Sequence, residues 1–353
     1  MNANNFVPIT RTPWGGKKII DLKKNSMPHL VHLWPERCGE SWEISTDKNF
    51  PSNVVDANGK AIDSFTALLE KNPIKLLGKK SFESHSHFCP LLLKWLNAQE
   101  VLSVQLHPNN QHPSLKADEC GKPESWLVLD TEPGGYVYLG FKEGLTQEKC
   151  IESLRKQDPD SCLHKVFPKK YDFISVPTGC IHAVGPGLLI AEPQYVKAGK
   201  SGKTWRISDW NRKYLSSGEQ SPQGQSRELH LEHAMGALDW SLPRGAQLEK
   251  ILIEQALHNQ KLGGHKFNPF VLKLLTEQGN FKIPQLMTDQ FFIATLASGS
   301  AKISHENSEF VELKSGESVF ISANVEQISV SLNSQNPMHK PCLAFFALNE
   351  ENL

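Results

Sequence analysis

The chain has 353 residues, 38 Lys and Arg balanced by 38 Asp and Glu, and 39% hydrophobic residues, which is enough for more than one domain. A net charge of zero excludes the broad basic surface of a nucleic-acid-binding protein. No apolar run approaches the ~18 residues that a membrane-spanning helix needs, and the start, MNANNFVPITRTPWGG, lacks the apolar core of a signal peptide. We therefore expect a cytoplasmic protein with no nucleic-acid partner and no membrane partner.

Seven scattered cysteines, none of them in a CxxC pair, indicate reduced thiols rather than a disulfide framework. Their odd number agrees with a reducing compartment. They are Cys38, Cys89, Cys120, Cys150, Cys162, Cys180 and Cys342.

Short apolar segments between turn residues recur along the chain and predict a mainly β protein. In chain order, strands are expected at residues 41–45, 101–108, 136–141, 171–177, 187–195, 268–275, 291–297, 301–306 and 318–323. Apolar residues at helical spacing predict helices at 61–72, capped by Asp63 or Ser64, at 145–157, capped by Thr146, and at 228–240, with Leu229 on the apolar side. The polar stretch 216–226 predicts a loop.

Two segments resemble each other. Residues 174–182 read ISVPTGCIH and residues 319–327 read VFISANVEQ, so that His182 falls on Gln327. In both, an apolar strand runs into a small turn and a polar end. This echo suggests a duplicated β-domain in which only the first copy keeps a ligand-type residue.

The strand within VLSVQLHPNN carries Gln105 and His107 two residues apart, so both side chains point to one face. Glu124 lies in GKPESW, and His182 follows a Pro-Thr-Gly turn. Two imidazoles, a carboxylate and an amide oxygen suit zinc. The alternative from spacing alone is that these are ordinary core or surface histidines, since the chain has 14 and contains no HExxH.

Two basic residues allow two interpretations each. Arg206, in KTWRISDWNR, is either the partner of a buried ion pair or an anion-binding group aimed into a cavity. Lys122 is either a turn lysine or a neighbour of a metal held by Glu124. Asp209 and Arg212 are interpreted as surface charges.

Taken together, these motifs resemble the type I phosphomannose isomerases of the cupin superfamily, in their shorter bacterial branch. The QxHP, KPE and PxGxxHA elements, in this order, are specific as a set. The resemblance covers most of the chain, at residues 12–16, 39–45, 89–110, 121–130, 176–194, 204–212 and 227–240.

The resemblance implies two cupin, or jelly-roll-like, β-sandwich domains with a helical segment between or beside them. The implied boundaries are a catalytic metal-binding domain at 1–212, a helical connecting segment at 213–265 and a metal-free cupin-like domain at 266–353. The family's zinc ligands match Gln105, His107, Glu124 and His182.

The resemblance also implies an enzyme of mannose metabolism, an isomerase that interconverts mannose 6-phosphate and fructose 6-phosphate. A proton moves between C1 and C2 through a cis-enediol that Zn²⁺ stabilises as a Lewis acid. The family's catalytic or substrate-binding cations match Arg206 and Lys122. The expected partner is a small-molecule sugar phosphate, and the sequence is compatible with a monomer.

One departure from the family stands next to the arginine. Family members usually carry a Ser-Asp pair with the aspartate four residues before it, where this chain has Gly202, and the segment after Glu192 is longer than usual. Glu43, Glu192 and Asp209 are the candidates to replace that carboxylate. The segment also contains lysines that we interpret as a solvated loop rather than as phosphate ligands, namely Lys197, Lys200 and Lys203.

Because of this departure, the sequence leaves alternatives to the isomerase. One is a non-catalytic cupin that binds a sugar phosphate, and another is an isomerase for a different sugar phosphate. An iron-dependent cupin dioxygenase is disfavoured, because many such enzymes present three histidines and one glutamate.

Overall fold

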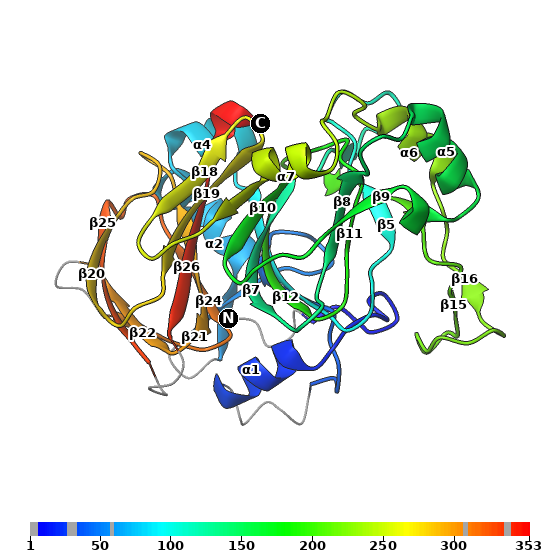
Figure 1. Ribbon diagram of the computed structural model, residues 1–353. Coiled ribbons are helices and arrows are strands. Elements are labelled where there is room, and N and C mark those ends of the chain that lie inside the picture. The colour runs from blue at the N-terminus through cyan, green and yellow to red at the C-terminus, as the bar shows by residue number, and fades with distance from the viewer. Residues whose placement is uncertain (1–5, 27–33, 57–59, 306–309, 335–339) are drawn as a thin grey trace.

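The computed structural model describes residues 6–26, 34–56, 60–305, 310–334 and 340–353. Figure 1 shows two β-sandwiches side by side, the first in cyan and green and the second in yellow to red. The prediction of a mainly β protein with two sandwiches is confirmed. Among the described helices, none is both long and apolar enough to cross a bilayer.

The first sandwich consists of two antiparallel sheets that face each other. The six-stranded sheet has the order β1 (Glu40–Ile44), β4 (Leu91–Ala98), β12 (Leu188–Tyr195), β7 (Glu124–Thr131), β10 (Asp172–Val176), β17 (Ile253–Gln255). The five-stranded sheet has the order β14 (Trp205–Ser208), β5 (Val104–Leu106), β11 (His182–Val184), β8 (Val137–Phe141), β9 (Leu163–Val166).

The second sandwich repeats this strand order. One sheet is β18 (Lys261–His265), β19 (Asn268–Leu275), β26 (Cys342–Leu348), β21 (Phe292–Ser298), β24 (Glu317–Ile321). The other is β20 (Gly279–Pro284), β25 (Gln327–Asn333), β22 (Ser300–Ser304), β23 (Phe310–Lys314). The order β4-β12-β7-β10 thus returns as β19-β26-β21-β24, and β5-β11-β8-β9 returns as β20-β25-β22-β23. His182 begins β11 and Gln327 begins β25, so the sequence echo corresponds to the same place in both sandwiches.

The remaining elements are short and lie around the sandwiches. The helices are α1 (Lys18–Ser26), α2 (Phe65–Lys71), α3 (Pro73–Leu77), α4 (Lys79–His85), α5 (Gln147–Arg155), α6 (Leu231–Ala237), α7 (Ala246–Leu252) and the 3₁₀ turns η2 (Pro159–Ser161) and η3 (Glu350–Asn352). The small strands are β2 (Asn53–Val55), β3 (Ala61–Ser64), β6 (Glu119–Cys120), β13 (Ser201–Gly202), β15 (Lys213–Tyr214) and β16 (Gln225–Ser226).

Each of the nine predicted strand segments contains a strand, although Glu306 lies outside the described residues. The helix predicted at 61–72 begins only at Phe65, because its first four residues form β3; Ser64 is its cap and accepts a hydrogen bond from Ala67 N at 3.0 Å. Thr146 caps α5 as predicted. The placement of Leu229 on a helix is wrong, because α6 starts at Leu231 and Leu229 is exposed.

For the domain boundaries we propose 1–212, 213–265 and 266–353. The middle stretch carries α6 and α7 and, in addition, one edge strand for each sandwich. Its β17 pairs with β10 of the first sandwich, and its β18 pairs with β19 of the second.

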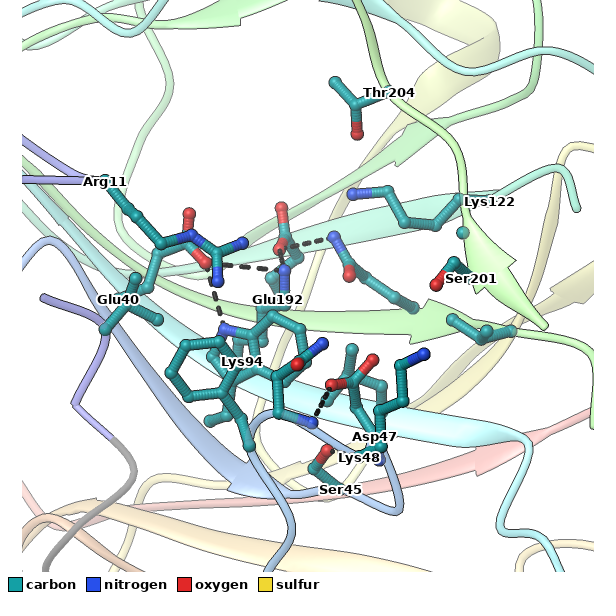
Figure 2. A pocket seen from close by; sticks show the side chains of 18 of the residues that line it. Arg11, Glu40, Ser45, Asp47, Lys48, Lys94, Lys122, Glu192, Ser201 and Thr204 are labelled. Carbon is teal, nitrogen blue, oxygen red and sulfur yellow. Dashed lines mark hydrogen bonds and ion pairs between the residues drawn. The ribbon is translucent and has the colours of Figure 1, made fainter. Parts of the chain in front are cut away.

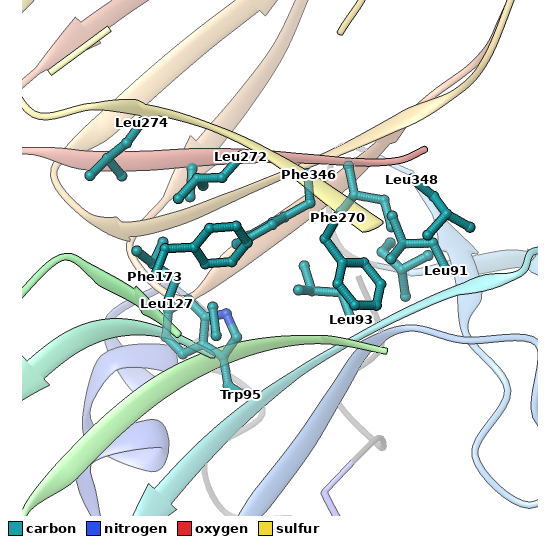
Figure 3. Close-up of a cluster of buried hydrophobic side chains, with 14 of the residues drawn as sticks. Leu91, Leu93, Trp95, Leu127, Phe173, Phe270, Leu272, Leu274, Phe346 and Leu348 are labelled. Carbon is teal, nitrogen blue, oxygen red and sulfur yellow. The ribbon is translucent and has the colours of Figure 1, made fainter. Parts of the chain in front are cut away.

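The two sandwiches share an apolar core between their larger sheets, which Figure 3 shows. Strand β4 is buried on both faces, and its alternate residues Leu91, Leu93 and Trp95 pack into this core. Because successive side chains of a strand point to opposite faces, the intervening Lys94 must point into the first sandwich. A buried charge in the middle of a mainly apolar strand is unusual and draws attention to the interior of the first sandwich.

A buried polar network also joins the sandwiches. Lys23 of α1 places its Nζ 2.8 Å from the Glu43 carboxylate and donates to Gly316 O at 2.6 Å. Ser318 Oγ of the second sandwich donates to Glu43 at 3.1 Å. The network therefore ties α1 and β1 to β24 through a paired charge.

Replacing Lys23 with methionine is expected to lower the free energy of unfolding by about 3–5 kcal/mol, since Glu43 would be left as a buried charge without its cation. Urea unfolding measures this effect. The matched control is Lys24→Met, whose exposed pairing with Asp21 predicts a change within about 0.5 kcal/mol. Equal losses in the two variants would contradict a stabilising role of the buried pair.

Candidate metal centre and active-site pocket

The inner face of the five-stranded sheet presents a row of polar side chains. Gln105 of β5 lies opposite His182 of β11 on one side and opposite Arg206 of β14 on the other. Residues directly opposite in antiparallel strands share a face, and His107, two residues after Gln105, points the same way. Neighbouring strands thus bring four sequence-predicted residues to one wall of the sandwich.

Glu124 faces this wall from the first position of β7 in the opposite sheet. One ligand atom each of His107, Glu124 and His182 lies within 4.8 Å of the others, and all three residues are buried. His107 Nε2 is 3.1 Å from Glu124 Oε2, and His182 Nε2 is 3.5 Å from Glu124 Oε1. The structure therefore brings three of the four predicted ligands together, and Gln105 lies beside them by its pairing with His182.

Backbone carbonyls orient both imidazoles. His107 Nδ1 donates to Lys203 O at 3.0 Å, and His182 Nδ1 donates to Cys180 O at 2.9 Å. A carbonyl can only accept, so Nδ1 carries the proton and the Nε2 lone pair points toward Glu124. Both Nε2 atoms are buried without a hydrogen-bond partner. This is the arrangement of a metal-ligating histidine, whose other nitrogen donates to a fixed acceptor.

The electrostatics of the cluster also suit a cation. Burial, together with the neighbouring His107, lowers the pKa of His182 to about 4, so the ring is neutral at physiological pH. Burial also lowers the pKa of His107, as does the charge of Lys122. For Glu124, burial alone would raise the pKa, but His107 and Lys122 outweigh it and hold it well below its usual range. Two imidazoles and a carboxylate are a donor set for a divalent metal.

A cavity of about 700 Å³ opens next to this cluster. It is lined by Gln105, Lys122 and Arg206 among the predicted residues, and its size is within the range of small-molecule sites. Lys122 is almost fully buried and lies with its Nζ 3.4 Å from Glu124 Oε2. Figure 2 shows this side chain pointing into the cavity above Ser201.

The motif-based predictions missed Lys94 and Glu40, which line the same cavity. Lys94 lies directly opposite Glu192 in the β4–β12 pairing, and its Nζ is 3.8 Å from Glu192 Oε2 and 3.5 Å from Glu40 Oε2 (Figure 2). Gln194 Nε2 donates to Glu192 at 2.6 Å and to Glu124 at 2.7 Å. The available signal was a single charge inside each of two apolar strands, LLLKWLNA and LLIAEPQY.

Among the three carboxylates considered for the missing aspartate, the cavity is lined by Glu192 alone. Glu43 is held in the network of Lys23, and Asp209 is paired with Arg212 and Arg227. Burial raises the pKa of Glu192, and the negative charge of Glu124 adds to the increase. Glu192 is thus the carboxylate that could exchange a proton with a ligand in the cavity.

The interpretation of Asp209 and Arg212 as surface charges is wrong. Both are buried, and they form an ion pair at 2.7 Å.

Arg206 donates from one terminal nitrogen to Glu228 O at 2.9 Å, while its Nε is buried without a hydrogen-bond partner. Arg206 also lines the cavity, to which it brings a positive charge.

The lysines of the longer segment have different environments. Lys197 and Lys200 line the cavity, and Lys200 is exposed. Lys203 is ion-paired with Glu119 at 2.6 Å. The interpretation of all three as a solvated loop is therefore wrong for Lys203, whose side chain is fixed.

The second sandwich has the same strand order but a different interior. Gln327 lies opposite Pro284, as His182 lies opposite Gln105, and Phe292 lies opposite Ile321, as Glu124 lies opposite Val176. The counterparts of Gln105 and Glu124 are thus Pro284 and Phe292. By the same spacing the counterpart of His107 is Leu286, which is buried in the apolar core. These replacements support the proposal that the second sandwich holds no metal.

Comparisons with known proteins identify relatives of this chain. The model of the phosphomannose isomerase type I catalytic domain matches residues 8–129. A mannose-6-phosphate isomerase of Streptococcus mutans is 29% identical over 290 residues, which cover 82% of this chain and 83% of that protein. The mannose-6-phosphate isomerase ManA of Bacillus subtilis is 30% identical over 236 residues, which cover 66% of this chain and 67% of that protein.

Solved structures show the same fold over nearly the whole chain. The mannose 6-phosphate isomerase of Bacillus subtilis aligns with a TM-score of 0.71 at 22% identity, covering 95% of this chain and 96% of that one. A putative mannosephosphate isomerase of Archaeoglobus fulgidus aligns with a TM-score of 0.69 at 22% identity, covering 98% and 95%. The predicted cupin fold is thereby confirmed. The sequence relatives and the matching family model show that the chain belongs to the type I phosphomannose isomerase family.

Proposed function

We propose that this protein is a zinc-dependent aldose–ketose isomerase that interconverts mannose 6-phosphate and fructose 6-phosphate. The observation that carries the proposal is the convergence of the unpartnered Nε2 atoms of His107 and His182 on the Glu124 carboxylate, beside a cavity that also contains Glu192 and Lys122. The names of the relatives supply the substrate.

Gln105, His107, Glu124 and His182 are the proposed zinc ligands. Two neutral imidazoles and a carboxylate favour zinc among the common divalent metals. When bound, zinc supplies Lewis-acid stabilisation of the negative charge that develops on the sugar oxygens. The backbone acceptors of the two histidines keep the rings oriented for this role.

Glu192 is the proposed proton-transfer group. Isomerisation removes a proton from one carbon and returns one to its neighbour, so a single carboxylate at the cavity wall can serve both steps through a cis-enediol. Gln194 and Trp126 Nε1 each donate a hydrogen bond to Glu192, which fixes the carboxylate plane. Its pKa is raised to about 8, mainly by burial, so both the base form and the acid form that the two steps require are populated near neutral pH.

Arg206 and Lys122 are the proposed cationic groups for the substrate. Lys122 is beside Glu124 and therefore next to the place where the enediolate charge develops. Arg206 lies one strand further along the wall and lines the cavity, where its guanidinium charge suits an anionic group such as phosphate. We also propose that the protein works as a cytoplasmic monomer on this small-molecule substrate. Seven buried, unpaired cysteines support a reducing compartment.

The test is a coupled assay of fructose 6-phosphate formation from mannose 6-phosphate, with metal content determined in parallel. Turnover is expected with zinc bound, loss of turnover with a chelator, and recovery on adding zinc. Bound zinc and bound mannose 6-phosphate without turnover would instead favour the non-catalytic binding protein. Turnover of another sugar phosphate, without turnover of mannose 6-phosphate, would indicate an isomerase for that other substrate.

A further inference from the structure

The segment of residues 201–203 is bound to the strand that leads into Lys122. Its strand β13 pairs in parallel with β6, with Ser201 opposite Glu119 and Gly202 opposite Cys120. Lys203 N donates to Cys120 O at 2.8 Å, and Lys203 Nζ pairs with Glu119 at 2.6 Å. Backbone and side chain thus hold this segment, which we call the 201–203 clamp, in a fixed place.

Gly202 of the clamp lies against the stem of Lys122. A Cβ atom at Gly202 would come within 2.9 Å of Lys122 Cδ and 3.0 Å of Lys122 Cγ. The φ angle of Gly202 lies outside the left-handed region, so an alanine there meets no backbone strain. Glycine is therefore required by the close approach of the lysine rather than by the backbone.

The same clamp holds one of the proposed ligands. Lys203 O accepts the hydrogen bond from His107 Nδ1 at 3.0 Å, and Thr204 Oγ1 is 3.4 Å from the same nitrogen. One short segment therefore contacts both the lysine above Glu124 and the histidine beside it. Because catalysis depends on precise distances, a small displacement of Lys122 or His107 would lower the reaction rate.

We propose that the 201–203 clamp positions Lys122 in the active site, and that Gly202 is the positioning residue that leaves room for the lysine stem. The proposal rests on the proposed function, in which Lys122 stabilises charge on the substrate. Lys122 reaches Glu124 across the space that a side chain at position 202 would fill. A methyl group there must push the stem aside and carry the ammonium group away from Glu124.

Gly202→Ala is expected to lower kcat by about tenfold to a hundredfold, with metal content unchanged. The control for a glycine-to-alanine change is Gly236→Ala in α6, where a Cβ would lie 3.6 Å from His112 Nε2, an ordinary contact, and kcat should stay at the wild-type value. Equal kcat in wild type and Gly202→Ala would overturn the proposal.

Lys122→Ala separates positioning from a general structural role. In that background the stem is gone, so adding Gly202→Ala should leave kcat unchanged. If Gly202→Ala alone lowers Tm, adding Lys122→Ala should restore Tm, because the clash with the lysine stem is removed. The test therefore remains decisive even if the single variant is destabilised. If Gly202→Ala lowers kcat in the Lys122→Ala background by the same factor as in the wild-type background, the proposal is contradicted.

A crystal structure of Gly202→Ala provides the measurement that does not depend on turnover. The separation of Lys122 Nζ and Glu124 Oε2 should exceed the 3.4 Å of the wild type. An unmoved lysine would overturn the clamp even if kcat falls. An inactive wild type would instead count against the proposed function, while the displacement of Lys122 would still decide the clamp.

Discussion

Replacing His182 with alanine is expected to remove bound zinc and to lower kcat/KM by about a thousandfold or more, since loss of a ligand exceeds the roughly 10–100-fold cost of losing a group that only supports one. His182 is fully buried, and its Nε2 points at Glu124 with no other partner. Metal analysis of the purified variant and the coupled assay measure the two effects.

The control is His258→Ala, which removes an imidazole of the 213–265 stretch that pairs with Glu277 and contacts the Phe281 ring edge-on. Its metal content and kcat/KM are expected to match those of the wild type. Full metal content in His182→Ala would rule out His182 as a ligand.

Glu192→Gln is expected to lower kcat by about 10²–10⁴-fold, the range for loss of a general acid–base group, while zinc remains bound. Glutamine keeps the volume of the side chain and removes the ability to take a proton. Single-turnover and steady-state assays, with metal content and Tm measured on the same preparation, separate this loss from loss of structure.

Glu43→Gln is the matched control, because Glu43 is an equally buried carboxylate that belongs to the network between the sandwiches. It is expected to lower Tm and to keep kcat within about twofold of wild type, since surface and structural changes outside a site act on stability. If Glu43→Gln and Glu192→Gln lose kcat alike, or if Glu192→Gln keeps its rate, Glu192 is not the proton-transfer group.

The clamp gives the departure at Gly202 a physical meaning. The space next to this position is filled by the Lys122 stem, so a carboxylate side chain could not be placed there without moving the lysine. Of the three candidates for that carboxylate, the one that lines the cavity is Glu192, which comes from β12. The absence of an aspartate before Arg206 therefore does not by itself speak against catalysis.

Local pattern was sufficient to predict most of the strands, because alternation along a strand and its turn residues act within a few positions. For the proposed ligands, local spacing left ordinary histidines as an alternative, and only the resemblance to a family favoured the metal site. Gln105 and His107 share a face through their spacing, and the order of three short motifs pointed to Glu124 and His182. Helix limits were less well predicted, since β3 takes the first residues of the segment that was expected to be helical.

Contacts between distant segments decided the rest. Lys94 and Glu192 meet only because β4 and β12 are paired, and the burial of Asp209 depends on Arg227, which comes later in the chain. The clamp depends on a parallel pairing of two-residue strands that no periodicity reveals. Side-chain spacing records which face a residue occupies, whereas burial, ion pairing and pKa depend on what the fold places opposite that face.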